Sequence, residues 1–324
     1  MAKVKSQKFA KFGCAGLVFR PRFARRGQPG RSAKKAIAIG LLWAAGTLAW
    51  GPDGHLMSAR VAVRALPGET PAFFRQSVEE LAYLCSEPDR WRDKGRSPAL
   101  TALTSADHWM HMENIQPGLP ATRYEFLLAN VGRKNPAGRP MTVEDLGTVA
   151  YAIAEYAERL TGEFRRWRAA PEETAEQRRI KRQIEQNIIY TGGVLGHWIT
   201  DPANPLHATA HHNGWDAEFP NPRGFAGKGI HGRFEADYVR ANIAEGDIAA
   251  RVGAPRAVGG WIEEAERYLR ASQALVEKVY ELDKQVPFGS GKEGAEAKAL
   301  AAERLAAGAA LLRDVWHSAW VKSR

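Results

Sequence analysis

Apolar residues recur with the period of an α-helix over most of the chain after residue 50, which constrains the fold more than any other feature. In the segment that starts at Pro171, the apolar residues Ile180, Ile184 and Ile188 fall on one face, because positions four apart share a side of a helix. We expect this helix to extend to His197, and further helices at 70–85, 142–167, 258–282 and 294–320. No stretch alternates convincingly with the period of a strand. The sequence therefore predicts an all-α fold in a single multi-helix domain.

Two segments break this helical pattern. Residues 86–120 and 201–229 are rich in proline, glycine and asparagine, and both contain histidines. Loops placed on a rigid scaffold often carry the chemistry of a protein. We therefore expect the functional residues to lie mostly in and beside these two segments.

The first 49 residues form a basic leader. They contain eleven Lys and Arg and no acidic residue, and they end in the apolar run AIAIGLLWAAGTLA at 36–49. This order is typical of a secretory signal, here cleaved before Trp50, and the run is shorter than the roughly 20 residues of a membrane span. We expect a periplasmic or secreted domain at 50–324 with no transmembrane segment after cleavage. The alternatives are translation from a later start codon and an uncleaved run that serves as an anchor.

Charge and cysteine content limit what the remaining chain can do. Of the 46 basic residues 11 lie in the leader, which leaves 35 basic against 36 acidic residues. Such a balance does not support strong electrostatic binding to duplex DNA. Cys85 would be the single cysteine of the mature chain, so no intramolecular disulfide can form.

The histidines have the spacing of metal ligands. In the stretch GHWITDPANPLH, His197 and Asp201 are four residues apart, and the prolines that follow would end a helix and let His207 return from a turn. His231 and Glu235 form a second pair with a spacing of four. One such group alone is usually an ordinary helix end, but clustered imidazoles and carboxylates are the ligands that zinc prefers. The sequence therefore predicts a zinc site.

At this point the motifs resemble a known family. WGPDGH directly after the expected cleavage, with H-x3-D-x5-H and a later H-x3-acid pair, resembles the S1/P1 nuclease and zinc-dependent phospholipase C superfamily over the whole mature chain. The resemblance implies an all-helical domain with three zinc ions. It implies a first zinc on Asp89, His111, His197 and Asp201, a second on the Trp50 amino group and carbonyl, His55 and the bridging Asp201, and a third on His207, His231 and Glu235.

The resemblance also implies a mechanism. A hydroxide on the zinc pair bridged by Asp201 would attack phosphorus in line, and Arg92 would bind the phosphoryl charge. The nuclease branch is favoured by W-x4-H and D-x2-R, so we expect an endonuclease that acts on single-stranded DNA or RNA, with no stable protein partner. Glu235 favours the phospholipase branch instead, and a phospholipase C or small phosphoesterase is the alternative.

Several assignments stay open at the level of sequence. His108 competes with the preferred His111, and Asp107 competes with Asp89. Met112 occupies the position where the nuclease branch stacks a base on an aromatic ring. The other residues concerned are Asn114, a possible hydrogen-bond partner for a base edge, and His211 and His212, whose roles are unassigned. A third hypothesis is a non-catalytic, membrane-tethered helical protein that stores or senses metal.

Overall fold

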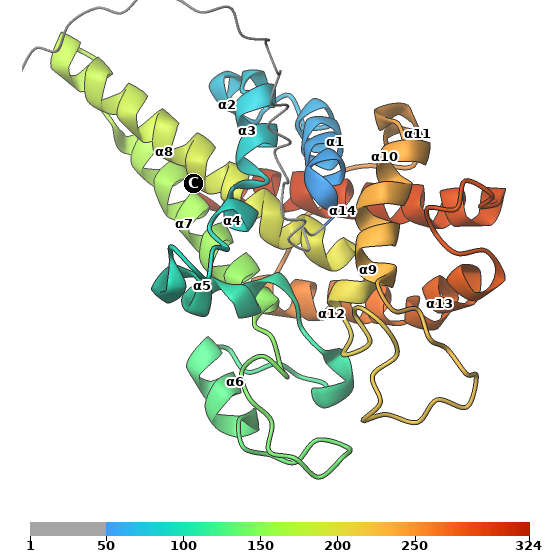
Figure 1. Ribbon diagram of the computed structural model, residues 1–324. Helices are drawn as coiled ribbons and strands as arrows, with labels where there is room; N and C mark the ends of the chain where they lie inside the picture. Colours follow the sequence, from blue (N-terminus) through green and yellow to red (C-terminus); the bar gives the residue numbers. More distant parts are fainter. Residues whose placement is uncertain (1–49) are drawn as a thin grey trace, which may run out of the picture. The chain divides into compact units, whose positions relative to one another are not determined.

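The computed structural model describes residues 50–324, and these residues form helices joined by loops (Figure 1). In chain order the α-helices are α1 (Gly51–Arg64), α2 (Ala72–Gln76), α3 (Val78–Leu84), α4 (Glu87–Arg90), α5 (Pro98–Thr104), α6 (Arg123–Asn130), α7 (Val149–Ala169), α8 (Ala175–Thr200), α9 (Ile230–Gly232), α10 (Val239–Asn242), α11 (Glu245–Ala249), α12 (Trp261–Gln273), α13 (Val276–Gln285) and α14 (Ala295–Lys322). Short 3₁₀ turns lie at η1 (Ser105–His108), η2 (Met112–Asn114), η3 (Asp201–Ala203) and η4 (Pro205–His207), and η5 (Arg233–Tyr238) is π-helical.

The all-α fold expected from the sequence is confirmed for the described residues. Between residues 50 and 324 the only β-type pairings are three isolated bridges. The same range contains no helix with the length and apolar composition needed to cross a bilayer. The expected signal segment and its cleavage lie outside the described residues.

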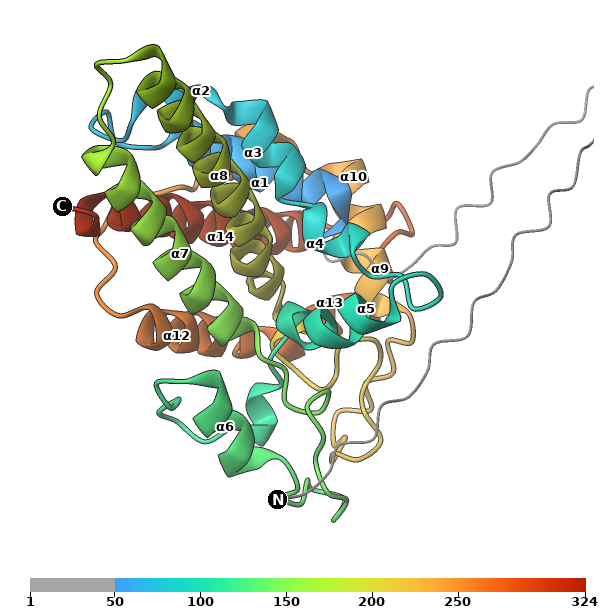
Figure 2. The same ribbon diagram turned by 90° about the vertical axis from the view of Figure 1, so that its left-hand side faces the viewer.

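Three long helices form the centre of the core. Helices α7 and α8 pack side by side, and α14 packs against both (Figures 1 and 2). Between them and α2, the ring of Phe74 lies edge-on to Trp316 at 5.3 Å, and both side chains are fully buried. This packing fixes the C-terminal end of α8, where His197 and Asp201 lie.

Two glycines let the neighbouring chain approach the C-terminal half of α8. A Cβ atom on Gly193 would lie 2.3 Å from the Leu84 Cβ, and one on Gly196 would lie 3.0 Å from the Cys85 Sγ. Any larger residue would push α3 away, because core packing leaves no room for an added methyl group. The close approach brings Cys85 and the short helix α4 up to the end of α8. Burial raises the pKa of the Cys85 thiol to about 12, so this free cysteine stays protonated at neutral pH.

Apart from shifts of a few residues at their ends, three of the expected helices are divided or begin later than expected. The segment 70–85 is divided at Ser77, and the segment 258–282 is divided at 274–275, where the Leu275 amide donates to the Ser272 carbonyl. Helix α7 begins at Val149 and not at Thr142, because Thr142 and Asp145 form a closed turn of their own, with the Thr142 amide 2.7 Å from the Asp145 Oδ2. Helical periodicity continues across all three breaks, so pattern alone could not locate them.

Candidate metal centre

The end of α8 places two ligand-type side chains on one face. His197 and Asp201 are one turn apart, with the His197 Nε2 atom 3.2 Å from the Asp201 Oδ2, and both are fully buried. The turns η3 and η4 then reverse the chain, so that the His207 Nδ1 comes within 3.7 Å of the same carboxylate. The structure thus brings together the three residues of the motif.

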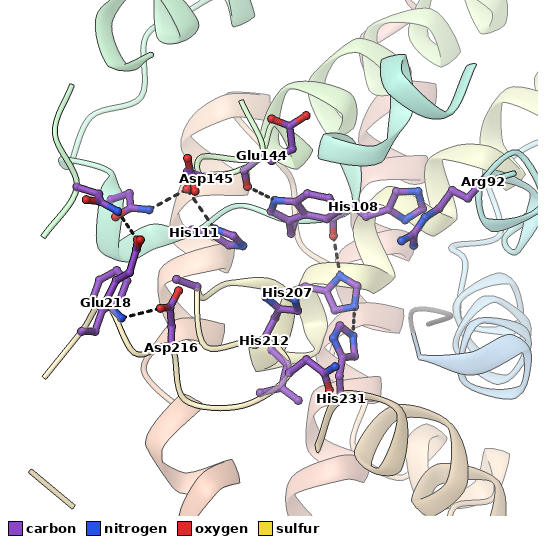
Figure 3. Close-up of a pocket in the computed structure, with 17 residues that line it drawn as sticks. Arg92, His108, His111, Glu144, Asp145, His207, His212, Asp216, Glu218 and His231 are labelled. Carbon is purple, nitrogen blue, oxygen red and sulfur yellow. Dashed lines mark hydrogen bonds between the residues drawn. The ribbon is translucent and has the colours of Figure 1, made fainter. Parts of the chain in front are cut away.

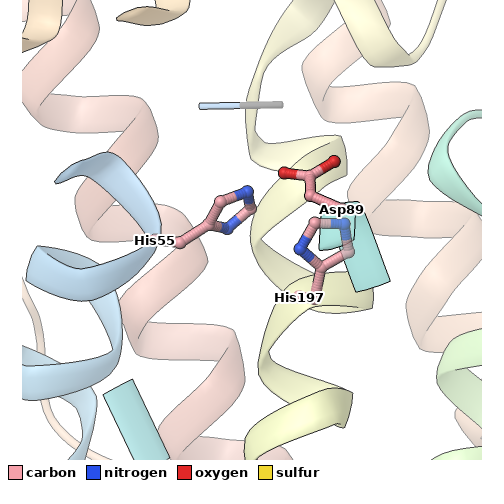
Figure 4. A group of neighbouring side chains, drawn as sticks. All are labelled: His55, Asp89 and His197. Atoms are coloured by element: carbon pink, nitrogen blue, oxygen red, sulfur yellow. The ribbon is translucent and has the colours of Figure 1, made fainter. Parts of the chain in front are cut away.

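Three more elements bring side chains to Asp201. From α1, the His55 Nε2 lies 3.3 Å from its Oδ1, and from η1 the His108 Nδ1 lies 3.0 Å from its Oδ2. Asp89 of α4 reaches the same cluster, with its Oδ1 3.9 Å from the His108 Nδ1. Figure 4 shows His55, Asp89 and His197 facing a common point, and their ligand atoms lie within 4.8 Å of one another. We call His55, Asp89, His108, His197 and Asp201 together the Asp201 cluster.

The preference for His111 over His108 does not agree with the structure. His108 ends η1 and packs edge-on against His197, with ring centroids 4.8 Å apart, whereas His111 belongs to none of the converging groups of ligand atoms among the described residues. Trp109 between them is extended, which carries the chain away from α8. The His111 Nδ1 donates instead to the Asp145 carbonyl at 3.1 Å.

The two candidate carboxylates, Asp107 and Asp89, have different neighbouring side chains. Asp107 accepts hydrogen bonds from the Thr148 hydroxyl at 2.6 Å and from the Arg123 Nη1 at 2.9 Å. Burial raises the pKa of Asp107, and Arg123 opposes this effect. Asp107 is therefore already paired, and Asp89 is the carboxylate that the structure places in the cluster.

A second cluster comprises His207, His231 and Glu235. The Nε2 atoms of His207 and His231 are 3.0 Å apart, and the Glu235 Oε2 lies 2.6 Å from His231 and 3.4 Å from His207. His231 and Glu235 are one turn apart, and Glu235 lies in the π-helical segment η5, a rare geometry that is frequent at functional sites. The three residues expected to form the third site are thus adjacent.

Hydrogen bonds fix the imidazole tautomers in both clusters. The His197 Nδ1 donates to the Cys85 carbonyl at 2.9 Å, and the His207 Nδ1 donates to the His108 carbonyl at 2.7 Å. The His55 Nδ1 donates to Thr200 at 2.7 Å, since the Thr200 hydroxyl itself donates to the Gly196 carbonyl. In its neutral form, each of these three rings therefore directs an unprotonated Nε2 into its cluster, as metal-binding histidines usually do. His108 differs, because its Nδ1 faces Asp201.

The unpaired atoms and their distances fit bound zinc. Buried polar atoms normally find a partner, yet several ligand-type atoms here have none among the described residues. These atoms are His55 Nε2, Asp89 Oδ1, His108 Nε2, Asp201 Oδ1 and Glu235 Oε1. Two ligands each 2.0–2.1 Å from a tetrahedral zinc lie about 3.3 Å apart, which is close to the spacing found here. A shared cation would replace the repulsion between facing lone pairs with attraction.

Burial and neighbouring charges set the protonation of the clusters. Burial lowers the pKa of His108 and of His231 to about 4, so both rings are neutral at pH 7. Burial raises the pKa of Glu235 to about 8 although His207 opposes it. Burial alone would also raise the pKa of Asp201, but His197 and His207 hold it well below its usual value. A cation on His207, His231 and Glu235 would therefore displace a proton from Glu235.

Trp50 starts α1 in a strained conformation. Its φ angle of 29° lies in the left-handed region, which costs a residue other than glycine on the order of 1–3 kcal/mol. The side chain is fully buried against Phe234, with ring centroids 5.6 Å apart. Whether the Trp50 amino group is free depends on cleavage at residues that the structure does not describe, so its role as a ligand stays a prediction.

A cavity of about 420 Å³ opens beside both clusters (Figure 3). Arg92, His108, His207 and His231 line one end, and the Arg92 Nη1 lies 3.5 Å from the Asp89 Oδ1. The opposite wall is acidic and comes from two loops; its carboxylates are Glu144, Asp145, Asp216 and Glu218. We call these residues the acidic wall. No sequence spacing indicated them, because the two loops are separated by about 70 residues that fold back through α7 and α8.

The two residues expected to contact a base are used differently. Met112 is 2% exposed and belongs to the core, so it offers no surface for stacking. Asn114 lines the cavity, but its Nδ2 donates to the Asp145 carbonyl at 2.8 Å. His211, of unassigned role, stacks on Trp215 at 3.8 Å, and its Nδ1 accepts from the Asp216 amide, so it supports the acidic wall.

Comparison with known proteins gives distant likenesses. No protein-family model and no curated protein matches the chain. Among solved structures, the alpha-toxin of Clostridium perfringens avian strain SWCP is 11% identical, with a TM-score of 0.40, over 83% of this chain and 62% of its own. The alpha toxin from Clostridium absonum is 11% identical, with a TM-score of 0.42, over 83% of this chain and 66% of its own. The chain thus spans slightly less than two thirds of their length. The chemistry of the site is therefore argued from the residues of this chain alone.

Proposed function

We propose that this protein is an exported zinc-dependent hydrolase of phosphoesters, and that its substrates are phospholipids or other small phosphoesters. The observation that carries the proposal is the shared cavity of about 420 Å³: it is bordered by Arg92, by His108 from the first cluster, and by His207 and His231 from the second. Cations on two adjacent clusters are a common arrangement for phosphoryl chemistry. The resemblance of the motifs to the S1/P1 nuclease and phospholipase C superfamily supports the same reaction class.

The residues of the chain have distinct roles in this proposal. Zinc ions at such clusters, when bound, polarise a phosphoryl oxygen and make water a better nucleophile. Asp201 lies between His55 and His108 and so is placed to serve two ions, while Asp89, His197, His207, His231 and Glu235 complete the donor set. Arg92 would bind the phosphoryl oxygens at the cavity end of the cluster.

The cavity lining favours a small phosphoester over single-stranded nucleic acid. Four carboxylates line the wall opposite Arg92, and a polyanion threaded through the cavity would meet them with the same sign of charge. The buried Met112 removes one base contact that the nuclease branch would use. These observations favour the alternative derived from Glu235, and nuclease activity becomes an outcome to be tested.

A direct assay tests the proposal. The exported protein, loaded with zinc, should release a phosphorylated head group from short-chain phospholipids faster than it cuts a single-stranded oligonucleotide of equal phosphate concentration. A chelator should abolish the release, and added zinc should restore it. Undiminished activity in metal-free protein would refute the metal-dependent reaction, and preferential cutting of the oligonucleotide would reinstate the nuclease.

Export can be examined on the same preparation. We propose that the mature chain starts at Trp50, which would free an amino group next to His55 on α1. A mass spectrum of the exported protein gives its first residue, and native conditions give its zinc content. A chain that keeps residues 36–49 and binds metal without hydrolysing any ester would support the membrane-tethered alternative instead.

A further inference from the structure

A row of histidines leads from the second cluster to the acidic wall. The ring centroid of His212 lies 6.0 Å from that of His231, which belongs to the second cluster. The ring centroid of His111 lies 6.0 Å from that of His212, and the two ring planes are 9° apart. Both His111 and His212 line the cavity (Figure 3), and neither belongs to a group of converging ligand atoms in the part of the chain that the structure describes. A group attached to phosphorus at His207 and His231 would therefore extend over these two rings.

His111 is fixed as a hydrogen-bond acceptor toward the cavity. Its Nδ1 donates to the Asp145 carbonyl, which also accepts the Asn114 amide. The Asp145 carboxylate is in turn bound by Arg139 through two contacts of 2.8 Å. Because the single proton of a neutral imidazole is used at Nδ1, the Nε2 atom can only accept. Burial, aided by His212, lowers the pKa of His111 to about 3, which keeps the ring neutral.

His212 has the same character. One ring nitrogen makes a hydrogen bond to the backbone of Ala210, so the second nitrogen is an acceptor. In its neutral form the His212 ring carries a single proton, which that hydrogen bond uses. The cavity thus presents two imidazole acceptors side by side and no imidazole donor from this pair.

The acidic wall completes this surface. Asp145 and Glu218 both pair with Arg139, whereas Glu144 and Asp216 form no ion pair within residues 50–324. The Asp216 Oδ1 accepts the Glu218 amide at 2.8 Å. Two uncompensated carboxylates beside two neutral acceptors favour a ligand group that is positively charged and rich in N–H donors.

We propose that this part of the cavity, formed by His111, His212 and Asp216, selects a phosphoester whose head group ends in a primary ammonium over one that ends in a quaternary ammonium. The proposal rests on the proposed function and names the substrate class of the same site. Both head groups carry one positive charge and would satisfy the carboxylates. Only the primary ammonium has N–H groups for the two imidazoles, whereas methyl groups would displace water from them and leave the acceptors unpaired.

A methylation series tests this selection at constant charge. Short-chain phosphatidylethanolamine and its N-methyl, N,N-dimethyl and N,N,N-trimethyl forms, with identical acyl chains, differ in the number of N–H donors. With zinc-loaded protein we expect kcat/KM to fall along the series by about 10- to 100-fold, because sites built to bind an N–H group reject analogues without it. A flat or rising series would overturn the proposal.

Matched variants assign the selection to the two rings. H111F and H212F keep a planar ring and remove both nitrogens, and we expect the fall along the series to shrink to about threefold or less while zinc content is unchanged. H317F is the control, because His317 lies on α14 and does not line the cavity. This variant should keep the full fall in kcat/KM along the series. Equal discrimination in all three variants would overturn the proposal.

A binding measurement separates this proposal from the proposed function. Calorimetric titration of the zinc protein with phosphoethanolamine and with phosphocholine reports selection without any hydrolysis. Tighter binding of phosphoethanolamine, lost in H111F, would support the selection even if no ester were cleaved. Equal affinities would overturn it, even if phospholipids were hydrolysed.

Discussion

The two ends of the cavity are built in different ways. At the inner end, helices α1 and α8 position the fully buried imidazoles of His55 and His197, and α4 positions the carboxylate of Asp89. Hydrogen bonds to Thr200 and to the Cys85 carbonyl fix the tautomers of the two rings. At the outer end, two loops supply carboxylates that are partly exposed and are joined to each other through Arg139. Helix packing thus sets the donor geometry at the inner end, whereas loop contacts set the charge of the outer end. Changes at the inner end should therefore alter zinc content and kcat, and changes at the outer end should alter KM.

The largest effect is expected for D201N. This substitution keeps the shape of the side chain and removes the negative charge that lies between His55 and His108. A bound ion contributes several kcal/mol to stabilising charge in the transition state, so we expect a loss of about 10³-fold or more in kcat with reduced zinc content. Phosphate release and metal analysis measure both quantities. D216N, at the outer end, is the contrasting variant and should raise KM while zinc content stays normal.

Removal of zinc should lower thermal stability. A ligand at a hundredfold excess over its Kd stabilises the folded state by about 2.7 kcal/mol, which corresponds to roughly 5–10 °C in Tm for a domain of this size. Thermal unfolding with chelator, and again after zinc is restored, measures the shift. Metal content is measured in the same samples, to confirm that the chelator has removed the zinc. An unchanged Tm in protein that has lost its metal would contradict the prediction that zinc stabilises the fold.

A smaller effect is expected when only the support of a ligand is changed. T200V removes the acceptor of the His55 Nδ1, and such supporting contacts are typically worth 10–100-fold in metal affinity. T161V is a close control, because Thr161 also donates to the carbonyl four residues earlier, at 2.7 Å, but lies on α7 away from the clusters. Zinc competition titrations should weaken for T200V alone. An equal loss of zinc affinity in T200V and T161V would indicate a general effect of replacing a buried threonine with valine.

Much of the inner end was predictable from sequence because it depends on short spacings. The pairs His197 with Asp201 and His231 with Glu235 lie one turn apart on helical segments, so the spacing itself places them on one face. The choice between His108 and His111 could not be made from spacing, because which ring reaches the cluster depends on one extended residue, Trp109, which follows a 3₁₀ turn. Three residues of spacing would keep both histidines near one face of a regular helix, and the departure from the helix separates them.

The outer end was not predictable, for a different physical reason. Arg139 joins Asp145 and Glu218, and Glu218 is 79 residues away in sequence. Nothing local marks these residues, since acidic and basic side chains are common in loops. Helices α7 and α8 pack side by side, and backbone hydrogen bonds such as that from the Met110 amide to the His207 carbonyl hold the two loop regions together.

The smallest effect is expected for R139Q, which separates the two loops without touching the clusters. We expect normal zinc content, little change in kcat and a KM that rises by a few fold, since partly exposed ion pairs contribute little. Hydrogen bonds from Arg139 hold the pKa of Asp145 well below its usual value of about 3.9. Because the folded pKa is depressed, the stabilisation is present above the unfolded pKa and is lost as the pH falls through the folded pKa.

The difference in Tm between the wild-type protein and R139Q should consequently be present at pH 7 and shrink as the pH falls below about 4. Both proteins are compared without zinc, so that protonation of the ligands does not enter the comparison. A Tm difference that stays constant from pH 7 to pH 3 would show that Arg139 acts through packing and not through the charge of Asp145. A fall in zinc affinity in R139Q would show instead that the outer loops help to form the clusters, and the division between the two ends would then fail.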